Sequence, residues 1–415
     1  MYWWENRFLK AENGKLCLGG RTAESIAESY GTPLFVYDRE QVRTNCDNLR
    51  RLFNKAIPQK LRICYAMKAN FHPEILKTLL SQGCWIDAVS PGEVDAALKA
   101  GFPEDRILFT GTSVSVSDLE KVFKRNNIIV TIDAIEQLEL MREVKNRVCR
   151  SREIKVMIRM NPGIGTGFSP KAITAGAKTS DGTPVKFGVE EKKVIPAVEK
   201  ASLYGFNPVG LHQHLGSGWT SENFEDVKSA VDIMFRKALD VQQRGFPLEL
   251  IDLGGGFGPR YSEDQDLFPL DKYAEHIAQR FSSERLDIKS LAVEPGKYLV
   301  GDAGVLLLRV EYVKESYGNL FACVNGGTFN TIPRPAIYTQ AHHHIINCSQ
   351  VASEKMVRMT VPGNLCETGD VFRKEVWMPL PKRGDILALL SAGAYCRSMA
   401  SHFNLREIPQ EIIIG

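Results

Sequence analysis

Eight short apolar runs, each followed by a helical pattern, occupy the chain between about residue 60 and residue 300. The runs cover residues 61–67, 85–89, 107–110, 128–132, 155–160, 208–212, 248–253 and 291–294. Buried strands that alternate with amphipathic helices are typical of a parallel sheet built from βα units. Eight units over about 240 residues match a closed (β/α)8 barrel better than an open, doubly wound sheet, which stays the alternative.

The connection after the second run predicts how a strand and its helix are joined. Ser90 is placed to cap the next helix, Pro91 suits the first helical position, and Glu93 can close a capping box. Gly101 then supplies a left-handed end to the helix. We therefore expect a helix between Ser90 and Gly101.

The pattern changes after about residue 300 to two-residue alternation with turn residues between the runs. These runs cover residues 305–313, 320–324, 356–361 and 386–390. They predict a mostly antiparallel β domain, which an early strand at 34–37 is expected to join. The expected domains are an N-terminal segment at 1–40 that joins the C-terminal β domain, a barrel at 41–300, and the C-terminal β domain at 301–415.

Composition and charge indicate a soluble globular protein of the cytoplasm. Hydrophobic residues make up 44% of the chain and charged residues 24%, while the net charge is only +3. No long basic run suggests nucleic-acid binding, no apolar stretch is long enough to span a membrane, and the start lacks a signal peptide's apolar core. The nine cysteines include no CxxC pair.

The cluster His342-His343-His344 is the one sequence feature that suggests a metal. It lacks carboxylate or cysteine partners at ligand spacing. We expect a structural or surface role for these histidines, and no metal site.

Lys68 directly follows the first run. In a (β/α)8 barrel the active site lies at the carboxyl ends of the strands, so Lys68 is placed at the expected site. A lysine buried at such a strand end has a lowered pKa and becomes a nucleophile toward carbonyl carbon, as a Schiff-base lysine must be. The alternative is a lysine whose stem packs while its amine reaches water.

Other strand ends carry residues that suit a phosphorylated ligand. Asp87 and Ser90 end the second run, and His212 and His214 end the sixth. The glycine-rich segment 254–258 follows the seventh run, and Glu294-Pro295-Gly296-Lys297 follows the eighth. Barrel phosphate sites are commonly built from the loops after strands seven and eight, although a glycine run can also be a plain turn.

A phosphate site beside a lysine and a carboxylate suggests pyridoxal 5'-phosphate. Lys68 would join the aldehyde, the glycines would hold the phosphate, and Glu294 would keep the pyridine nitrogen protonated. His214 is preferred to His212 for stacking on the ring, because Ser217 then lies near the phosphate. Each histidine could also be only a satisfied barrel residue.

Seven motifs in order resemble the fold-type III pyridoxal-phosphate decarboxylases, and among them the diaminopimelate decarboxylase family. They are Tyr65-Ala66-Met67-Lys68-Ala69-Asn70, His214-Leu215-Gly216-Ser217, Gly254-Gly255-Gly256-Phe257-Gly258, Glu294-Pro295-Gly296-Lys297, Arg334-Pro335-Ala336-Ile337-Tyr338, Cys366-Glu367-Thr368-Gly369-Asp370 and Gly393-Ala394-Tyr395. The resemblance covers nearly the whole chain. It implies an alanine-racemase-like barrel with a C-terminal β domain, and decarboxylation of meso-2,6-diaminopimelate to L-lysine and CO2.

The resemblance also assigns residue roles. Lys68 and Cys366 would be catalytic, with Cys366 returning a proton to the α-carbon. The cofactor-binding set would be Lys68, Asp87, His214, Ser217, Gly254, Gly255, Gly256, Glu294, Gly296, Lys297 and Tyr395. Arg334 and Tyr338 would bind the distal carboxylate of the substrate, and Glu367 its distal ammonium. The family works as a homodimer with shared active sites, to which Cys366 and Glu367 come from the other chain.

Three departures from the family pattern concern the substrate end. Lys297 stands where the family commonly has arginine, Asn325-Gly326-Gly327 replaces Asp-Ala-Gly, and the loop at 161–188 is longer than in many members. One alternative is therefore a decarboxylase of a related amino acid or carboxy-polyamine in a siderophore, antibiotic or polyamine pathway. A racemase and a catalytically inactive relative are further alternatives, against which the intact Lys68 and Cys366 argue.

Overall fold

The computed structural model describes residues 2–57, 61–283, 286–338 and 340–415, and these divide into two compact units. Unit 1 comprises Met1–Asn45, Pro259–Asp266 and Lys297–Gly415. Unit 2 comprises Cys46–Gly258 and Leu267–Gly296. Helix α2 (Arg39–Ala56) contributes residues to each unit.

Unit 2 is built on eight parallel strands that close into a barrel. They are β5 (Leu61–Ala66), β6 (Trp85–Ala88), β7 (Ile107–Phe109), β8 (Ile129–Ile132), β9 (Lys155–Asn161), β11 (Asn207–His212), β12 (Leu250–Asp252) and β13 (Ser290–Val293). Neighbouring strands pair in chain order, and the pairing of β13 with β5 closes the ring. The barrel prediction is confirmed, and every predicted run contains one of these strands or differs from it by a residue or two. A two-residue strand, β10 (Val189–Glu190), also pairs with β9.

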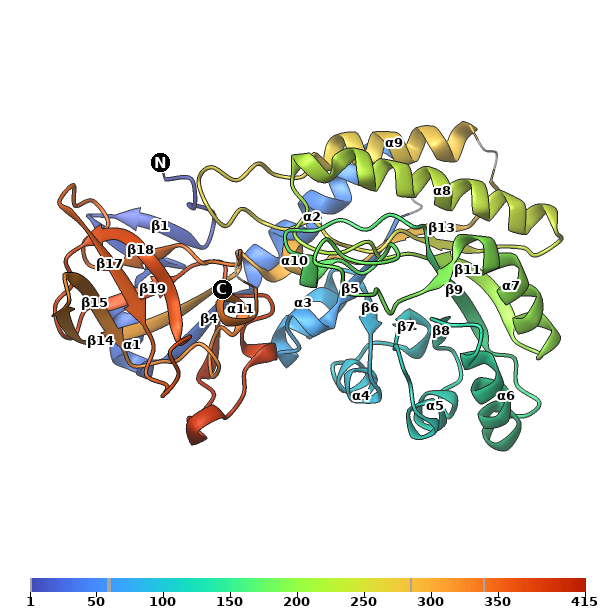
Figure 1. Cartoon of the computed structure of the whole chain (residues 1–415), viewed down its shortest axis with the longest axis horizontal. Coiled ribbons are helices and arrows are strands. Elements are labelled where there is room, and N and C mark those ends of the chain that lie inside the picture. The colour runs from blue at the N-terminus through green and yellow to red at the C-terminus, as the bar shows by residue number, and fades with distance from the viewer. Residues whose placement is uncertain (1, 58–60, 284–285, 339) are drawn as a thin grey trace. The chain divides into compact units, whose positions relative to one another are not determined.

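Amphipathic helices follow the barrel strands. They are α3 (Pro73–Ser81), α4 (Pro91–Lys99), α5 (Val116–Phe123), α6 (Gln137–Val148), α7 (Val194–Leu203), α8 (Phe224–Gln243) and α9 (Leu270–Ser283). Figure 1 shows α4 to α7 on the outer side of the strands, with α8 and α9 side by side. Helix α8 buries one apolar stripe that includes Val227, Ala230, Val231 and Met234, as its 3.6-residue period predicts.

The start and end of α4 follow from its sequence. The hydroxyl of Ser90 accepts the backbone N–H of Glu93 at 3.2 Å, which confirms the predicted cap. The Glu93 carboxylate accepts the N–H of Val89 at 2.7 Å, one residue before the predicted capping-box partner. Gly101 adopts φ +100°, the left-handed conformation expected after the helix.

A layer of apolar side chains fills the barrel interior. Its buried members are Cys64, Leu108, Ile129, Met157, Val209, Leu250 and Ala292, each from or next to a different strand. Because this layer is packed, the barrel is no pore, and the carboxyl ends of the strands are held in fixed positions around one opening.

Unit 1 contains a mixed sheet of eight strands arranged around β14 (Gly304–Ser316). The others are β4 (Leu34–Asp38), β15 (Asn319–Val324), β16 (Ile345–Asn347), β17 (Met356–Pro362), β18 (Val371–Pro379), β19 (Ile386–Leu389) and β20 (Gln410–Ile414). Only the pairs β15–β17 and β4–β20 are parallel among the described strands of this sheet, so the prediction of a mostly antiparallel domain is confirmed. β4, from the N-terminal segment, pairs with β14.

Smaller elements complete unit 1. They are the strands β1 (Leu9–Glu12), β2 (Lys15–Leu18) and β3 (Arg21–Thr22), and the helices α1 (Ala23–Tyr30), α10 (Lys297–Val300) and α11 (Arg334–Ile337). The core of this unit joins residues of the early and late segments, including Leu34, Val36, Val305, Leu307 and Ala388. Among the described residues, no helix has both the length and the apolar composition to cross a bilayer.

Candidate active site

The carboxyl ends of the barrel strands surround a cavity of about 290 Å3. Its lining residues are Lys68, Val89, Thr110, Thr112, Arg159, Thr174, Phe187, His212, His214 and Glu294. Three predicted cofactor residues therefore meet here, namely Lys68, His214 and Glu294. The cavity lies at the end of the barrel where the active sites of (β/α)8 enzymes are found.

Lys68 lies in a short 3-10 turn, η1 (Met67–Ala69), immediately after β5. Its Nζ atom is 3.1 Å from Oδ2 of Asp87, which is fully buried at the end of β6. The lysine side chain itself keeps 35% exposure, so it is only partly buried. The strand ends at Ala66, two residues earlier, which leaves the amine at the edge of the cavity and paired with a carboxylate.

Asp87 is held by two partners. Its Oδ1 atom accepts the hydroxyl of Thr110, and Lys68 contacts the other oxygen. Burial and the nearby Glu294 carboxylate raise the pKa of Asp87, while Lys68 acts in the opposite direction. Asp87 therefore fixes the position of the lysine amine.

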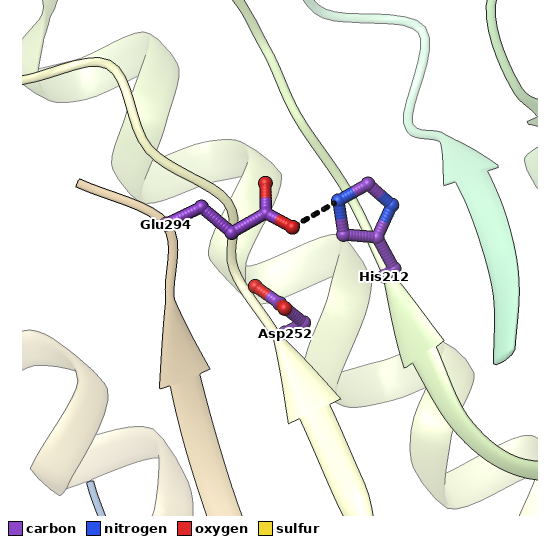
Figure 2. Close-up of side chains that lie close together, drawn as sticks. All are labelled: His212, Asp252 and Glu294. Carbon is purple, nitrogen blue, oxygen red and sulfur yellow. Dashed lines mark ion pairs between the residues drawn. The ribbon is translucent and has the colours of Figure 1, made fainter. Parts of the chain in front are cut away.

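Glu294 follows β13 and is ionised. Figure 2 shows its carboxylate turned toward the ring of His212, whose Nε2 is 3.2 Å from Oε1. Nδ1 of His214 is 3.9 Å from Oε2. Burial opposes ionisation, but His212, His214 and Lys68 outweigh it and hold the pKa of Glu294 at about 2.

Asp252 lies beside this carboxylate, and its pKa is shifted in the opposite direction. It ends β12, and its Oδ1 accepts the N–H of Gly254 at 2.9 Å. Burial and the charge of Glu294 raise the pKa of Asp252 well above its ordinary value. His212, Asp252 and Glu294 offer ligand atoms within 4.8 Å of one another.

His214 is neutral and fixed in orientation. Its Nδ1 accepts the N–H of Gly255 at 3.2 Å, and the hydroxyl of Thr174 donates to its carbonyl at 2.9 Å. Burial lowers the pKa of His214 to about 3. A neutral imidazole at the cavity wall can pack against an aromatic ligand. Ser217 follows in the same segment, and its carbonyl accepts the N–H of Phe168 at 3.0 Å.

Close packing requires the glycines after β12. A Cβ on Gly255 would lie 2.0 Å from the Glu294 carbonyl oxygen, and one on Gly256 would lie 2.1 Å from the indole of Trp219. The N–H groups of Gly254 and Gly255 already donate to Asp252 and His214. The segment thus lets the ends of β11 and β13 approach one another, and its role toward a phosphate stays a prediction.

The sequence prediction missed Arg159, which contributes to the cavity wall. It lies near the carboxyl end of β9, its Nη1 is 3.3 Å from Oδ1 of Asp133, and its guanidinium stands 4.5 Å from the ring centroid of Phe187. A cation among the apolar residues 156–160 was the signal that could have identified it.

The loop at 161–188 also contributes to the cavity, through Thr174 and Phe187. It packs along the segment after β11, where the N–H of Thr174 donates to the carbonyl of Leu215 at 3.2 Å and Ile173 bridges to Gly216. These contacts hold part of the loop at the wall of the cavity.

Other predicted site residues belong to unit 1. Lys297 begins α10 and is buried, with its Nζ 4.8 Å from the ring centroid of Tyr395. Arg334 begins α11 and is also buried. The backbone N–H of Tyr338 donates to the Arg334 carbonyl at 2.8 Å, so the two proposed substrate residues lie at opposite ends of one short helix.

Cys366 and Glu367 are exposed within unit 1. The backbone N–H of Cys366 donates to the side chain of Asn404 at 2.8 Å. Asp370 is buried and accepts hydrogen bonds from Thr328 and from the N–H of Leu365. It therefore fixes the loop that presents Cys366 and Glu367.

The side chain of Asn325 has hydrogen-bond partners within unit 1. Its amide donates to the carbonyl of Thr32 at 2.8 Å, and its Oδ1 accepts the N–H of Arg309 at 2.8 Å. These bonds tie the sheet of unit 1 to the N-terminal segment.

Comparisons with known proteins agree with this geometry. Residues 40–301 match the family model "Pyridoxal-dependent decarboxylase, pyridoxal binding domain". A diaminopimelate decarboxylase of Methanothermobacter thermautotrophicus is 37% identical over 97% of this chain and 91% of its own length, and one of Staphylococcus aureus is 32% identical over 96% and 92%. The crystal structure of diaminopimelate decarboxylase from M. jannaschii in complex with L-lysine has a TM-score of 0.88 at 28% identity, covering 99% of this chain and 93% of that one.

Proposed function

Because the chain belongs to the family of pyridoxal-dependent decarboxylases, we propose that it decarboxylates meso-2,6-diaminopimelate to L-lysine and CO2 with pyridoxal 5'-phosphate as cofactor. One observation carries the proposal. The amine of Lys68 and the ionised carboxylate of Glu294 line a single cavity at the carboxyl ends of the barrel strands.

The residues of the cavity fit this cofactor. The carboxylate of Glu294 is buried and lines the cavity, so it can accept a hydrogen bond from a protonated ring nitrogen. Lys68 supplies the primary amine that an aldehyde needs, and the neutral ring of His214 supplies a flat apolar face. Ser217, Gly256, Gly296, Lys297 and Tyr395 are the proposed neighbours of the phosphate.

When bound, the cofactor supplies an aldehyde that takes up the substrate amine and a ring that accepts the electron pair left by departing CO2. Glu294 stays negatively charged in this environment, and it thereby favours a protonated ring nitrogen and a stronger electron acceptor. Asp87 holds the Lys68 amine in place at 3.1 Å. Cys366 is proposed to return a proton from its Sγ to the α-carbon.

The substrate end is assigned by residue chemistry. The planar guanidinium of Arg334 can bind the distal carboxylate in two-pronged fashion, with Tyr338 as a second donor. Glu367 carries the charge that suits the distal ammonium. Binding of the distal carboxylate by Arg334 and Tyr338 would distinguish diaminopimelate from amines that lack a second carboxyl group.

We further propose a homodimer with shared active sites, in which Cys366 and Glu367 act in the partner's site. Their exposure in unit 1, on a loop fixed by Asp370, supports a role outside their own chain's core. A reducing cytoplasm is the proposed location, since all nine cysteines are free thiols.

The direct test measures CO2 release by the cofactor-loaded protein from four substrates, namely meso-diaminopimelate, L-lysine, L-ornithine and carboxynorspermidine. Release from the first alone is expected. CO2 release from only one of the other three would show that the chain is a decarboxylase with a different substrate. CO2 release from none of the four would contradict the proposed function.

A further inference from the structure

The middle residue of the histidine cluster 342–344 is part of a buried side-chain stack in unit 1. His343 is buried, and its Nδ1 is 2.7 Å from the carbonyl oxygen of Leu390. Its Nε2 is 4.0 Å from the buried thiol of Cys396. Burial, together with the charge of Arg334, lowers the pKa of His343 to about 3. A neutral ring must therefore donate from Nδ1 to Leu390, which fixes both the tautomer and the orientation.

The edge of this imidazole meets the ring of Tyr261. The two ring centroids are 5.6 Å apart, and the ring planes are inclined by 86°. On the same tyrosine, the Arg334 guanidinium stands 4.8 Å from the ring centroid. The stack therefore runs from Leu390 through His343 and Tyr261 to Arg334.

This arrangement constrains the arginine. A guanidinium over an aromatic face is attracted by the ring quadrupole, and the attraction grows as water is excluded. Because Arg334 is buried, the orientation of the Tyr261 ring limits the orientations that its guanidinium can take. The neutral state of His343 matters too, since a second cation behind the tyrosine would repel Arg334.

The other two histidines of the cluster have different surroundings. His344 contacts Trp3 edge to face at 5.2 Å, and His342 is half-buried. The aromatic partner of His344 is thus Trp3, whereas that of His343 is Tyr261. His344 is therefore a suitable control position.

We propose that Tyr261, supported by His343, is a positioning residue that orients Arg334 toward the distal carboxylate of the substrate. The inference rests on the proposed function, because Arg334 is the carboxylate ligand only in that assignment. It predicts a selective effect on ligands that carry this carboxylate. It also gives the histidine cluster a role without a metal ion.

The test measures ligand binding to the cofactor-loaded protein by calorimetry, alongside steady-state kinetics. L-lysine keeps the distal carboxylate, whereas cadaverine has the same carbon chain without it. In Tyr261→Leu, the Kd of L-lysine and the KM for meso-diaminopimelate should each rise about 10-fold, with kcat within about 2-fold and the cadaverine Kd unchanged. Tyr261→Phe keeps the aromatic face and should restore both values, and His344→Gln should match the wild type.

The outcomes separate this inference from the proposed function. An unchanged L-lysine Kd in Tyr261→Leu, or equal weakening of L-lysine and cadaverine, would overturn the positioning role. If Tyr261→Leu does not fold, His343→Gln replaces it, with a smaller rise in the L-lysine Kd expected and an unchanged value counting against the inference. Failure of the wild type to decarboxylate meso-diaminopimelate would instead contradict the proposed function.

Discussion

His212 Nε2 lies 3.2 Å from Oε1 of Glu294, and only 2% and 3% of the two side chains are exposed. His212 and Lys68 lower the pKa of this carboxylate, while burial and the charge of Glu294 raise the pKa of the adjoining Asp252. Environments that separate the pKa values of two neighbouring acids often assign them different chemical roles. Here the charged acid is the proposed partner of the cofactor nitrogen.

Replacement of this charge should impair chemistry more than cofactor binding. Glu294→Gln keeps the shape of the side chain but removes the charge that favours a protonated ring nitrogen. We expect kcat to fall about 100-fold or more, with cofactor still bound by its absorbance. A variant with bound cofactor and near wild-type kcat would contradict the assigned role.

Lys68 should be the point of covalent attachment for the cofactor. Borohydride reduction of the loaded wild type, followed by peptide mass spectrometry, should find the added mass on Lys68. Lys68→Arg preserves a cation beside Asp87 but offers no primary amine, so no added mass is expected there. Labelling of a different lysine in the wild type would refute this role for Lys68.

The eight barrel strands could be predicted because each is a short apolar run bounded by a polar or turn residue. The two-residue strand β10 is too short to give such a signal. Arg159 was missed because its importance depends on Phe187, which approaches it from a distant loop. The hydrogen bond of Asn325 could not be predicted because its partner Thr32 lies 293 positions away in the sequence. Contacts of this kind follow from tertiary packing and not from local pattern.

Loss of the guanidinium of Arg334 should weaken substrate capture far more than cofactor binding. In Arg334→Ala, the KM for meso-diaminopimelate should rise about 100-fold, because a desolvated carboxylate loses its charged partner. The cofactor Kd, from absorbance titration, should change little, and Arg334→Lys should recover part of the loss. Equal weakening of substrate and cofactor would contradict the carboxylate role.

Sharing of active sites between two chains predicts complementation. Lys68→Ala and Cys366→Ala should each be nearly inactive alone. If both residues act in the same site from different chains, random mixing places one intact site in each heterodimer, and heterodimers make up about half of the dimers. About a quarter of the wild-type activity should return after mixing. No recovery, with mixed dimers verified by differential tagging, would exclude shared sites.

Acid should destabilise unit 1 through His343. The folded-state pKa of this residue is about 3, whereas the ordinary histidine value is 6.5. Below pH 6.5 His343 binds a proton in the unfolded chain but stays neutral in the folded chain. Its contribution to the free energy of unfolding is therefore complete above pH 6.5 and is lost as the pH falls toward 3. The free energy of unfolding should decrease by about 1.4 kcal/mol per pH unit in this window because of this group. His343→Gln should show a shallower pH dependence in denaturant unfolding between pH 6.5 and 4. His402→Gln, at an exposed position, serves as the control. If the free energy of unfolding has the same pH dependence in the wild type and in His343→Gln, His343 is not the group responsible.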